Sequence, residues 1–449
     1  MLLLSVLSFL CVANVSGLNP VIVKGYKFFD SVTGEEIVVK GIDYYPRANT
    51  GPYDINSYDF FSNKHRAIWE RDIPYLKGLG VNALRLYSVD PKEDHSEFMN
   101  ALNEAGIYAL VAVTAACPTC AVTRAYPPEC YPNDLKARGQ GVINEFVMYN
   151  NTLAISTGNE VNLFTPIGQP QVNAPCQKKF LRDMREYLAG CPHLRQVPIG
   201  LVSADYFRGA FANYYNCQEN PNDPYEFAEW YGLNSYVFCN GNVSHFDKAP
   251  GFIYLAQSFQ SYDYSIPVML TEFGCLSPTF KTIDGYQAQR NFLQAKWLIT
   301  EDTMRDQFVG GFAFEYSMEA ANAGGYPFKV YAGANWGIGK FLYDSACCEI
   351  FCVSLSYPLL VLVRQDTSVL LDAMMSRSIA RTTQFQATTT CRQHTSTPVL
   401  ICRQRWTNLS FPSIVRVEPS AQVGSLVLPT IPGRRTRLLT ASVRRFLLL

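Results

Sequence analysis

The sequence predicts an α/β protein, a (β/α)₈ TIM-type barrel, from three observations. Eight short segments rich in aliphatic and aromatic residues recur over about 320 residues, and most end in a polar or aromatic cluster. Amphipathic stretches with apolar residues at helical spacing fill several of the gaps. This alternation favours a closed parallel barrel. A doubly wound open sheet is the alternative, but no Gly-x-Gly-x-x-Gly loop follows its first strand.

The eight predicted strands are too short and too apolar to be surface helices. In chain order they are 36–46, 81–88, 107–115, 153–160, 197–205, 231–238, 266–274 and 310–317. Helices are predicted where apolar residues recur every three or four positions. These stretches are 64–80, 95–106, 177–190 and 286–308.

Composition bounds the function. The 449 residues carry 38 Lys and Arg against 38 Asp and Glu. A nucleic-acid partner would need an excess of basic residues, and the whole chain has none. With 48% hydrophobic residues the chain can bury a large core. Residues 351–449 differ, because they hold twelve Arg, no Lys and three acidic residues.

The N-terminus and the cysteines indicate a secretory route. Residues 1–17 form an apolar run that ends in small residues, which is typical of a signal peptide, although a basic start is missing. A buried first strand is the alternative. Fourteen Cys and the sequons at Asn150 and Asn242 agree with an oxidising compartment. The pair Cys117 and Cys120 could be redox-active or bind zinc, but no second CxxC motif and no suitably spaced His accompany it. We therefore expect structural disulfides, no metal and no cofactor.

In a (β/α)₈ barrel, functional residues lie at the carboxyl ends of the strands. There the sequence places two carboxylates, Glu160 and Glu272, among amide, guanidinium and aromatic groups. The other strand-end residues are Asp43, Tyr44, Tyr45, Arg85, Tyr87, Asn159, Asn234, Tyr236, Glu315 and Tyr316. Of these we take Tyr45, Arg85 and Asn234 as substrate-binding candidates.

Two facing carboxylates are the apparatus that cleaves glycosidic bonds. One protonates the departing sugar oxygen while the other attacks the anomeric carbon. Strands four and seven lie roughly opposite each other in the barrel, so Glu160 and Glu272 can both point inward. A gap of about 5 to 5.5 Å would retain configuration. Arg85 would keep Glu272 ionised. The alternatives are a helix-capping role for Glu160 and a salt bridge for Glu272.

Residues 19–344 resemble the fungal-type β-1,3-glucanosyltransferases, glycoside hydrolase family 72. The landmarks that carry the resemblance are Val39-Lys40-Gly41-Ile42, Arg71-Asp72-Ile73-Pro74-Tyr75-Leu76, Leu84-Arg85-Leu86-Tyr87, Gly158-Asn159-Glu160-Val161-Asn162, Val197-Pro198-Ile199-Gly200, Tyr231-Gly232-Leu233-Asn234-Ser235-Tyr236, Thr271-Glu272-Phe273-Gly274-Cys275, Gly310-Gly311 and Glu315-Tyr316. The resemblance implies a secreted retaining enzyme of the cell wall or outer plasma membrane that transfers β-1,3-glucan chains.

The resemblance also implies roles for individual residues. Glu160 would be the acid/base and Glu272 the nucleophile. Tyr87, Asn159, Tyr236 and Tyr316 would line the sugar subsites. Disulfides would join Cys239 to Cys275, and Cys217 to Cys347 or Cys348. Membrane attachment would come only through a glycolipid anchor, a signal that residues 444–449 do not match.

The sequence departs from the family at several positions. Trp69 and Phe98 stand where the family has a pair of Cys, which we interpret as one lost disulfide. Tyr45 stands where a Gln is expected. Residues 319–322 are out of step with the usual pattern. Cys117, Cys120, Cys130, Cys176 and Cys191 lie outside the family's cysteine pattern, and five cysteines cannot all pair among themselves.

The domain organisation predicted is a signal peptide at 1–17, a catalytic barrel at 18–344 and an unassigned tail at 345–449, which we expect to be irregular and disordered. Two interpretations of the tail stay open: an out-of-frame terminus, and a basic tail that binds acidic wall or membrane components. Three functions also stay open. Glucan transfer is favoured over retaining endo-glucan hydrolysis and over glucan binding without catalysis.

Overall fold

The computed structural model describes residues 17–47, 55–122, 127–164, 172–237, 245–276 and 290–317, together with the backbone of four strands between 339 and 407. Eight parallel strands close into a barrel, in the order β12-β3-β4-β5-β6-β7-β8-β9. Their bounds are β3 Val39–Tyr44, β4 Ala83–Leu86, β5 Tyr108–Ala112, β6 Thr152–Asn159, β7 Ile199–Ala204, β8 Tyr231–Asn234, β9 Val268–Phe273 and β12 Phe308–Ala313. Each lies within or next to a predicted strand, so the barrel is confirmed.

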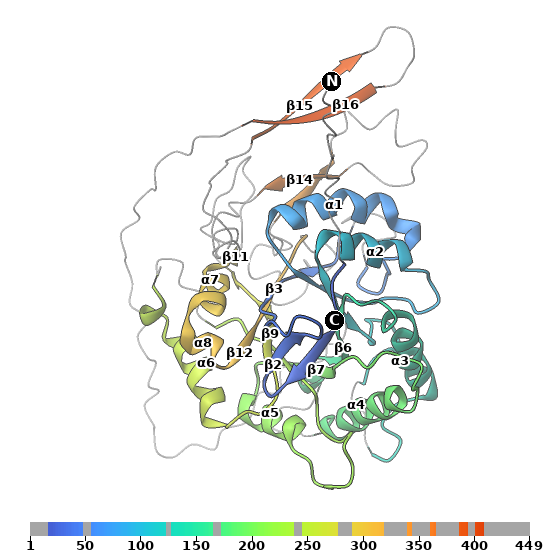
Figure 1. Cartoon of the computed structure of the whole chain (residues 1–449), viewed down its shortest axis with the longest axis vertical. Helices are drawn as coiled ribbons and strands as arrows, with labels where there is room; N and C mark the ends of the chain where they lie inside the picture. The colour runs from blue at the N-terminus through green and yellow to red at the C-terminus, as the bar shows by residue number, and fades with distance from the viewer. Residues whose placement is uncertain are drawn as a thin grey trace, which may run out of the picture. The chain divides into compact units, whose positions relative to one another are not determined.

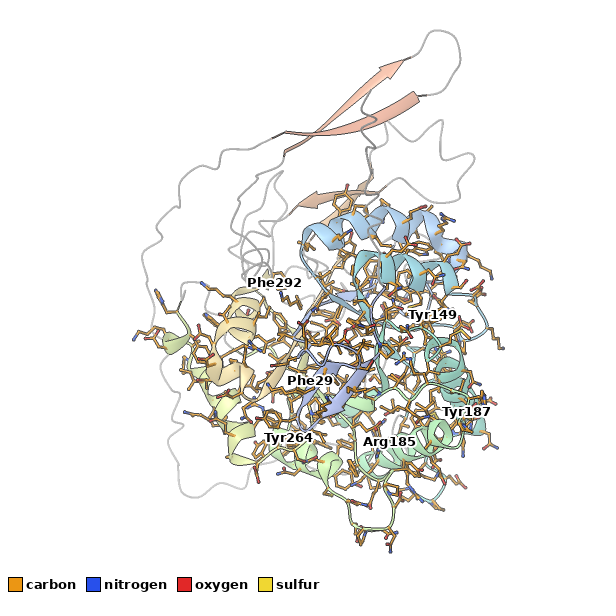
Figure 2. All side chains as sticks on the ribbon, in the orientation of Figure 1. Phe29, Tyr149, Arg185, Tyr187, Tyr264 and Phe292 are labelled. Atoms are coloured by element: carbon orange, nitrogen blue, oxygen red, sulfur yellow. A yellow bond between two sulfur atoms is a disulfide. The ribbon has the colours of Figure 1, made fainter. Side chains whose placement is uncertain are left out.

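Helices surround the strands (Figure 1), as a parallel barrel requires to bury both faces of its sheet. The α-helices are α1 Arg66–Gly78, α2 Ser96–Ala105, α3 Asn133–Phe146, α4 Ala174–Ala189, α5 Arg208–Asn216, α6 Pro250–Ser261, α7 Leu293–Thr300 and α8 Asp302–Arg305. Short 3₁₀ turns are η2 Asn63–His65, η3 Val161–Phe164 and η4 Phe246–Lys248. Figure 2 shows side chains filling the space between the strands and the helices.

The helix predictions were right for α1, α2 and α4, and wrong in extent for residues 286–308. There β11, Arg290–Asn291, pairs with β10, Cys275–Leu276, and only α7 and α8 are helical. The break between α7 and α8 is at Glu301, whose backbone is extended at φ −83° and ψ 123°. Phe308 already belongs to β12. Residues 286–289 lie outside the described residues.

The barrel closes where β12 pairs with β3 on one side and β9 on the other. Gly310 permits this closure, because its φ is +109° and a Cβ there would lie 2.0 Å from the Val39 carbonyl oxygen. One strand along, the Phe312 ring occupies the space that a Cβ on Gly41 would need. A large side chain opposite a glycine is how a small barrel fills its interior.

A hairpin that the sequence analysis did not predict precedes the barrel. Strands β1, Val21–Lys24, and β2, Lys27–Asp30, pair antiparallel around Gly25, whose φ is +58°. Val21 and Phe28 are buried in a cluster with Val39 and Ala83, which begin β3 and β4. The hairpin therefore covers the amino-terminal end of the barrel and leaves the opposite end for the site.

Trp69 on α1 and Phe98 on α2 pack edge to face, with ring centroids 5.6 Å apart, and both are buried. The two positions where the family has cysteines are thus in contact here, as the interpretation of a lost disulfide requires. Two disulfides form elsewhere, Cys117–Cys120 and Cys130–Cys176, while Cys191 is a free thiol. Cys117 and Cys120 are thus joined in a disulfide, as predicted, and their structural role stays a prediction.

Paired strands lie just before the tail and within it where the structure describes this part of the chain. Strand β13, Gly339–Tyr343, pairs with β14, Leu360–Arg364, and β15, Gln386–Gln393, pairs with β16, Leu400–Thr407. The rest of 345–449 and residues 1–16 lie outside the described residues, so the disordered tail and the signal peptide stay predictions. None of the helices in the described part of the chain is both long and apolar enough to span a membrane.

Candidate active site

Backbone irregularities aim the two glutamates into the mouth of the barrel. The pairing of β6 with β7 shifts register between Ser156 and Asn159, and the pairing of β8 with β9 shifts between Leu233 and Asn234. The second shift sets Asn234 opposite Glu272. Glu160 follows β6 with φ +51°, a left-handed conformation that non-glycine residues rarely adopt. Bulges and such backbone outliers cluster at functional sites.

Arg85 on β4 hydrogen-bonds to residues from several strands of the site. Its side chain is buried at 1% exposure. Nη1 donates to Glu272 Oε1 at 2.8 Å and to the Thr271 carbonyl oxygen at 3.1 Å, and Nη2 donates to Asn159 Oδ1 at 2.7 Å. Burial alone would lower the pKa of Arg85, but the acidic groups around it raise that pKa above its ordinary value. The guanidinium is therefore a fixed positive charge beside Glu272.

Glu272 accepts hydrogen bonds on both carboxylate oxygens. Oε1 accepts from Arg85 and from the Tyr87 hydroxyl at 3.0 Å, and Oε2 accepts from the Tyr236 hydroxyl at 2.7 Å. The residue is 7% exposed. An ion pair and two hydroxyl donors fix the orientation of the carboxyl group. Glu272 is therefore suited to act as a nucleophile.

Glu160 has a different environment. Its Oε1 accepts one hydrogen bond, at 3.0 Å, from Asn234 Nδ2. Burial, and next the negative charge of Glu272, raise the pKa of Glu160 to about 7, although Asn234 and Arg85 act in the opposite direction. A carboxyl group that still carries its proton near neutral pH is suited to act as a general acid.

Hydrogen bonds fix the orientation of both amides in the site. The Thr271 hydroxyl donates to Asn234 Oδ1 at 2.8 Å, which leaves Asn234 Nδ2 to donate to Glu160. Arg85 can only donate, so its bond to Asn159 Oδ1 turns Asn159 Nδ2 away from the guanidinium. Asn159 is partly exposed, and its amide can donate to a sugar hydroxyl beside Glu160. Thr271 was named only as part of the landmark that contains Glu272, and nothing in its local sequence indicated this role.

The structure brings together seven of the nine predicted catalytic and substrate-binding residues. The other two, Tyr45 and Tyr316, are buried, and the Tyr45 ring packs edge to face on Tyr87 with ring centroids 6.3 Å apart. Tyr45 is 2% exposed, and its hydroxyl donates to the carbonyl oxygens of Ile55 and Tyr58. Tyr316 is fully buried and packs edge to face on Tyr44. Neither ring has a face open to a sugar, so both are core residues here. Arg85 also faces Glu272 and Asn159 rather than the solvent.

Asp43 on β3 belongs to the same network. It is fully buried, and its Oδ1 accepts from Arg85 Nη1 at 3.2 Å and lies 2.9 Å from the Tyr87 hydroxyl oxygen. Burial raises the pKa of Asp43 well above its ordinary value, although Arg85 opposes this shift. The strand-end rule selected Asp43, but nothing in its local sequence indicated that it would share two donors with Glu272.

Of the cysteines in the two predicted pairs, the structure describes only the side chain of Cys217. Cys239 and the side chain of Cys275 lie outside the described residues, as do Cys347 and Cys348. Cys217 is an exposed free thiol, which differs from the expected bridge. Its Sγ lies 3.3 Å from the ammonium nitrogen of Lys178 on α4. Among the described residues, no group of three or more His, Cys, Asp or Glu could hold a metal ion.

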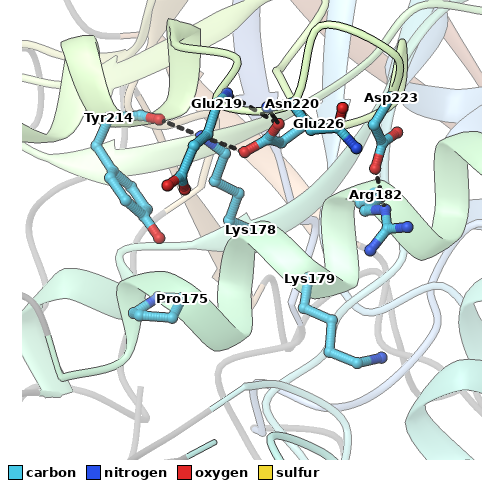
Figure 3. Close-up of a pocket in the computed structure, with 9 residues that line it drawn as sticks. All are labelled: Pro175, Lys178, Lys179, Arg182, Tyr214, Glu219, Asn220, Asp223 and Glu226. Carbon is cyan, nitrogen blue, oxygen red and sulfur yellow. Dashed lines mark hydrogen bonds and ion pairs between the residues drawn. The ribbon is translucent and has the colours of Figure 1, made fainter.

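A hollow of about 510 Å³ on the flank of the barrel is a weaker candidate site (Figure 3). Basic residues of α4 face acidic residues that follow α5, and they pair with each other: Arg182 with Asp223 at 2.6 Å and Lys178 with Glu226 at 4.0 Å. The charges are thus balanced within the hollow, and it contains none of the residues at the barrel mouth. The barrel mouth around Glu160 and Glu272 is therefore the stronger candidate site.

The known proteins that this chain resembles in sequence belong to one family. The 1,3-beta-glucanosyltransferase GAS5 of Saccharomyces cerevisiae is 33% identical over 305 residues, 67% of this chain and 57% of that protein. The 1,3-beta-glucanosyltransferase gel1 of Aspergillus fumigatus is 32% identical over 309 residues, 68% of this chain and 60% of that protein. The chain therefore spans about three fifths of the length of these relatives.

A solved structure of Saccharomyces cerevisiae Gas2p in complex with laminaripentaose matches with a TM-score of 0.60 and 25% identity, over 81% of this chain and 70% of that one. The family model described as Glucanosyltransferase, glycoside hydrolase family 72, matches residues 10–328. The resemblance inferred from the sequence is confirmed, and the chain belongs to the glucanosyltransferase family 72 of the glycoside hydrolases.

Proposed function

We propose that this protein is a retaining β-1,3-glucan transglycosylase, a 1,3-β-glucanosyltransferase, that remodels cell-wall glucan. One observation carries the proposal: the two glutamates at the barrel mouth have opposite environments. Glu272 is paired with a cation and two hydroxyls, whereas one amide contacts Glu160, whose pKa is raised to about 7. The substrate class is supported by the relatives named 1,3-beta-glucanosyltransferases and by the laminaripentaose complex of Gas2p.

In the first step Glu272 attacks the anomeric carbon of a bound glucan while Glu160 gives its proton to the departing glycosidic oxygen. Arg85 and the hydroxyls of Tyr87 and Tyr236 hold Glu272 in one orientation. The amide of Asn159 can donate to the hydroxyl next to the reacting carbon, a bond that strengthens as positive charge develops on the sugar ring. The product is a glycosyl ester on Glu272.

The second step needs Glu160 to change from an acid to a base. Formation of the ester removes the negative charge of Glu272, which is one of the causes that raise the pKa of Glu160. The pKa of Glu160 then falls, and its carboxylate can accept the proton of an incoming sugar hydroxyl. Attack by that hydroxyl makes a longer chain, and attack by water gives hydrolysis. Retaining endo-β-1,3-glucan hydrolysis is the second candidate, because it uses the same catalytic residues.

We further propose that the protein is secreted and acts at the cell wall or the outer face of the plasma membrane. The apolar run at residues 1–17 and the disulfides Cys117–Cys120 and Cys130–Cys176 support this route. Asn150 is exposed at the turn after α3, so its sequon is accessible for glycosylation. A glycolipid anchor is a family property that we carry over as part of this proposal.

Product sizing tests the reaction. The wild-type protein should convert a defined β-1,3-gluco-oligosaccharide into both shorter and longer chains. Because each glutamate has a separate chemical task, Glu160→Gln and Glu272→Gln should each lower turnover at least about 10³-fold. The control Glu104→Gln, at an exposed position of α2, should leave turnover unchanged. Shorter products alone would indicate hydrolysis, and substantial turnover by either active-site variant would refute its assigned role.

A second test concerns the charge of Glu272. In Glu272→Gln the charge is absent, so the pKa of Glu160 should fall below about 7, while burial still keeps it above its ordinary value. Carbon-13 NMR titration of the carboxyl groups measures this directly, with Glu160→Gln identifying the signal. In the wild type, the rate of the first step should fall as pH rises through about 7, because the acid loses its proton. An unchanged pKa in Glu272→Gln would contradict the coupling.

A further inference from the structure

Two aromatic rings are exposed just after the carboxyl end of β7, the strand whose Val202 carbonyl oxygen accepts from the Glu160 N–H. Strand β7 ends at Ala204, and the next residues include Tyr206, 38% exposed, and Phe207, 50% exposed. Their ring centroids are 4.4 Å apart, with an interplanar angle of 72°. Large rings usually gain free energy by burial, so an exposed pair at the functional end of a barrel indicates a contact surface.

The backbone holds these rings in place. Phe207 has φ +50° and ψ 44°, a left-handed conformation that is costly for a bulky residue. The amide of Asn162 donates to the carbonyl oxygens of Ala204 at 3.0 Å and Tyr206 at 3.4 Å, and its oxygen accepts from the Ala204 N–H at 3.0 Å. Asn162 lies two residues after Glu160, so these hydrogen bonds connect the segment that carries Tyr206 and Phe207 to the segment that carries Glu160.

We propose that Tyr206 and Phe207 form a platform that binds the acceptor glucan chain. This inference rests on the proposed function and names a subsite for it. The acid/base residue touches the oxygen of the leaving chain and later the hydroxyl of the acceptor, so the acceptor lies on the side of the mouth next to Glu160. Pyranose rings present flat apolar C–H faces, which stack on aromatic rings and exclude water.

The surroundings fit a neutral polysaccharide. Asp205 and Arg208 flank the rings and pair with each other at 2.6 Å, so they add hydrogen-bonding groups without net charge. Beyond them Tyr254 on α6 is 66% exposed, and the Arg208 guanidinium lies 5.8 Å from its ring centroid. Aromatic faces alternating with polar groups match a chain whose apolar faces are edged by hydroxyls.

The test compares Tyr206→Ala and Phe207→Ala with Tyr26→Ala. Tyr26 is a matched control, because it is 45% exposed on the hairpin at the opposite end of the barrel. Each platform variant should raise the KM for an added laminari-oligosaccharide acceptor about tenfold, the loss expected for one aromatic contact. The ratio of longer to shorter products should fall, and Tyr26→Ala should change neither quantity.

The proposal is overturned if the platform variants change the acceptor KM no more than the control does. If the wild type makes no longer products, the proposed transfer fails, and the platform is then tested by calorimetric binding of laminaripentaose. That titration uses Glu160→Gln with and without Phe207→Ala. A binding constant that is equal in the two proteins overturns the platform, and about tenfold weaker binding without the Phe207 ring supports it.

A second inference comes from the network around Asp43. The hydroxyl of Tyr87 has one proton and lies within hydrogen-bond distance of two carboxyl oxygens, Asp43 Oδ1 at 2.9 Å and Glu272 Oε1 at 3.0 Å. The same two oxygens both accept from Nη1 of Arg85. Asp43 Oδ2 is buried, and no hydrogen-bond partner for it is found among the described residues. A buried carboxylate oxygen without a partner is costly, and a neutral carbonyl oxygen is much less so.

We propose that Asp43 is a neutral carboxylic acid that directs the Tyr87 proton toward Glu272. The protonated Oδ1 of Asp43 donates a hydrogen bond to the Tyr87 oxygen, which can also accept from Arg85 Nη1. The Tyr87 hydroxyl then donates its own proton in a hydrogen bond to Glu272 Oε1. Arg85 and Tyr87 lie within hydrogen-bond distance of the Asp43 carboxyl group, and the charge of Glu272 acts on it from nearby. With Asp43 neutral, the charge of Arg85 is balanced by Glu272 alone. Asp43 is thus a positioning residue.

Two substitutions of similar size separate a neutral donor from an anion. Asp43→Leu removes the donor and should lower kcat about 30-fold, with a smaller change in KM. In Asp43→Asn an amide N–H can replace the carboxyl O–H, so most of the lost kcat should return. Infrared difference spectra of wild type minus Asp43→Asn at neutral pH should contain the carbonyl stretch of a protonated carboxyl group. An Asn variant as slow as the Leu variant, or no such band, overturns the proposal. If Asp43→Leu does not fold, the infrared spectrum decides.

Discussion

The buried guanidinium of Arg85 is the interaction on which the site depends. One positive charge, 1% exposed, contacts the nucleophile candidate, the amide that precedes the acid and the hydroxyl of Tyr87. A buried charge that loses its partner costs about 3 to 5 kcal/mol, so these groups hold one another in place. The strands that supply them are β4, β6 and β9, which are not neighbours. Closure of the barrel therefore brings these groups together, and Gly310 contributes by allowing β12 to approach β3 closely.

Two chemically identical side chains acquire different properties from their surroundings. Glu272 has three donors on its two oxygens, whereas Glu160 has one amide and the repulsion of its neighbour. The proposed roles of Glu272 as nucleophile and Glu160 as acid follow from this asymmetry. Hydrogen bonds run from the Thr271 hydroxyl to Asn234 and from Asn234 to Glu160. The orientation of the Glu160 side chain is thus fixed by residues that lie behind it.

The sequence predicted the barrel and most of the site because both follow from local patterns. Apolar strands with a polar residue at the carboxyl end place Glu160, Glu272, Arg85 and Asn234 at one mouth of the barrel, whatever the conformation of the loops. The sequence could not predict the direction in which a side chain at the end of a strand points. Side chains alternate across a strand, and a bulge shifts that alternation. Tyr45 and Tyr316 therefore satisfied the rule and are nevertheless buried in the core.

Other elements were missed for different reasons. Helix α3 has buried residues Leu135, Val142, Ile143 and Phe146 at helical spacing, a signal that was present but interrupted by glycines. The partners of Cys130 and Asp43 could not be predicted, because they lie on segments distant in the sequence. The contact between Trp69 and Phe98, in contrast, was anticipated from a paired departure, because two positions that change together are neighbours in space.

The central claim is that Glu272 forms the covalent bond to sugar in a site organised by Arg85. A β-1,3-gluco-oligosaccharide fluoride with fluorine at the adjacent carbon forms the ester quickly and releases it slowly, so the modified protein can be digested and its labelled peptide sequenced by mass spectrometry. The account predicts one sugar per chain, attached to Glu272. Attachment to Glu160, Asp43 or any other residue, or no attachment by a protein that still turns over glucan, would contradict it.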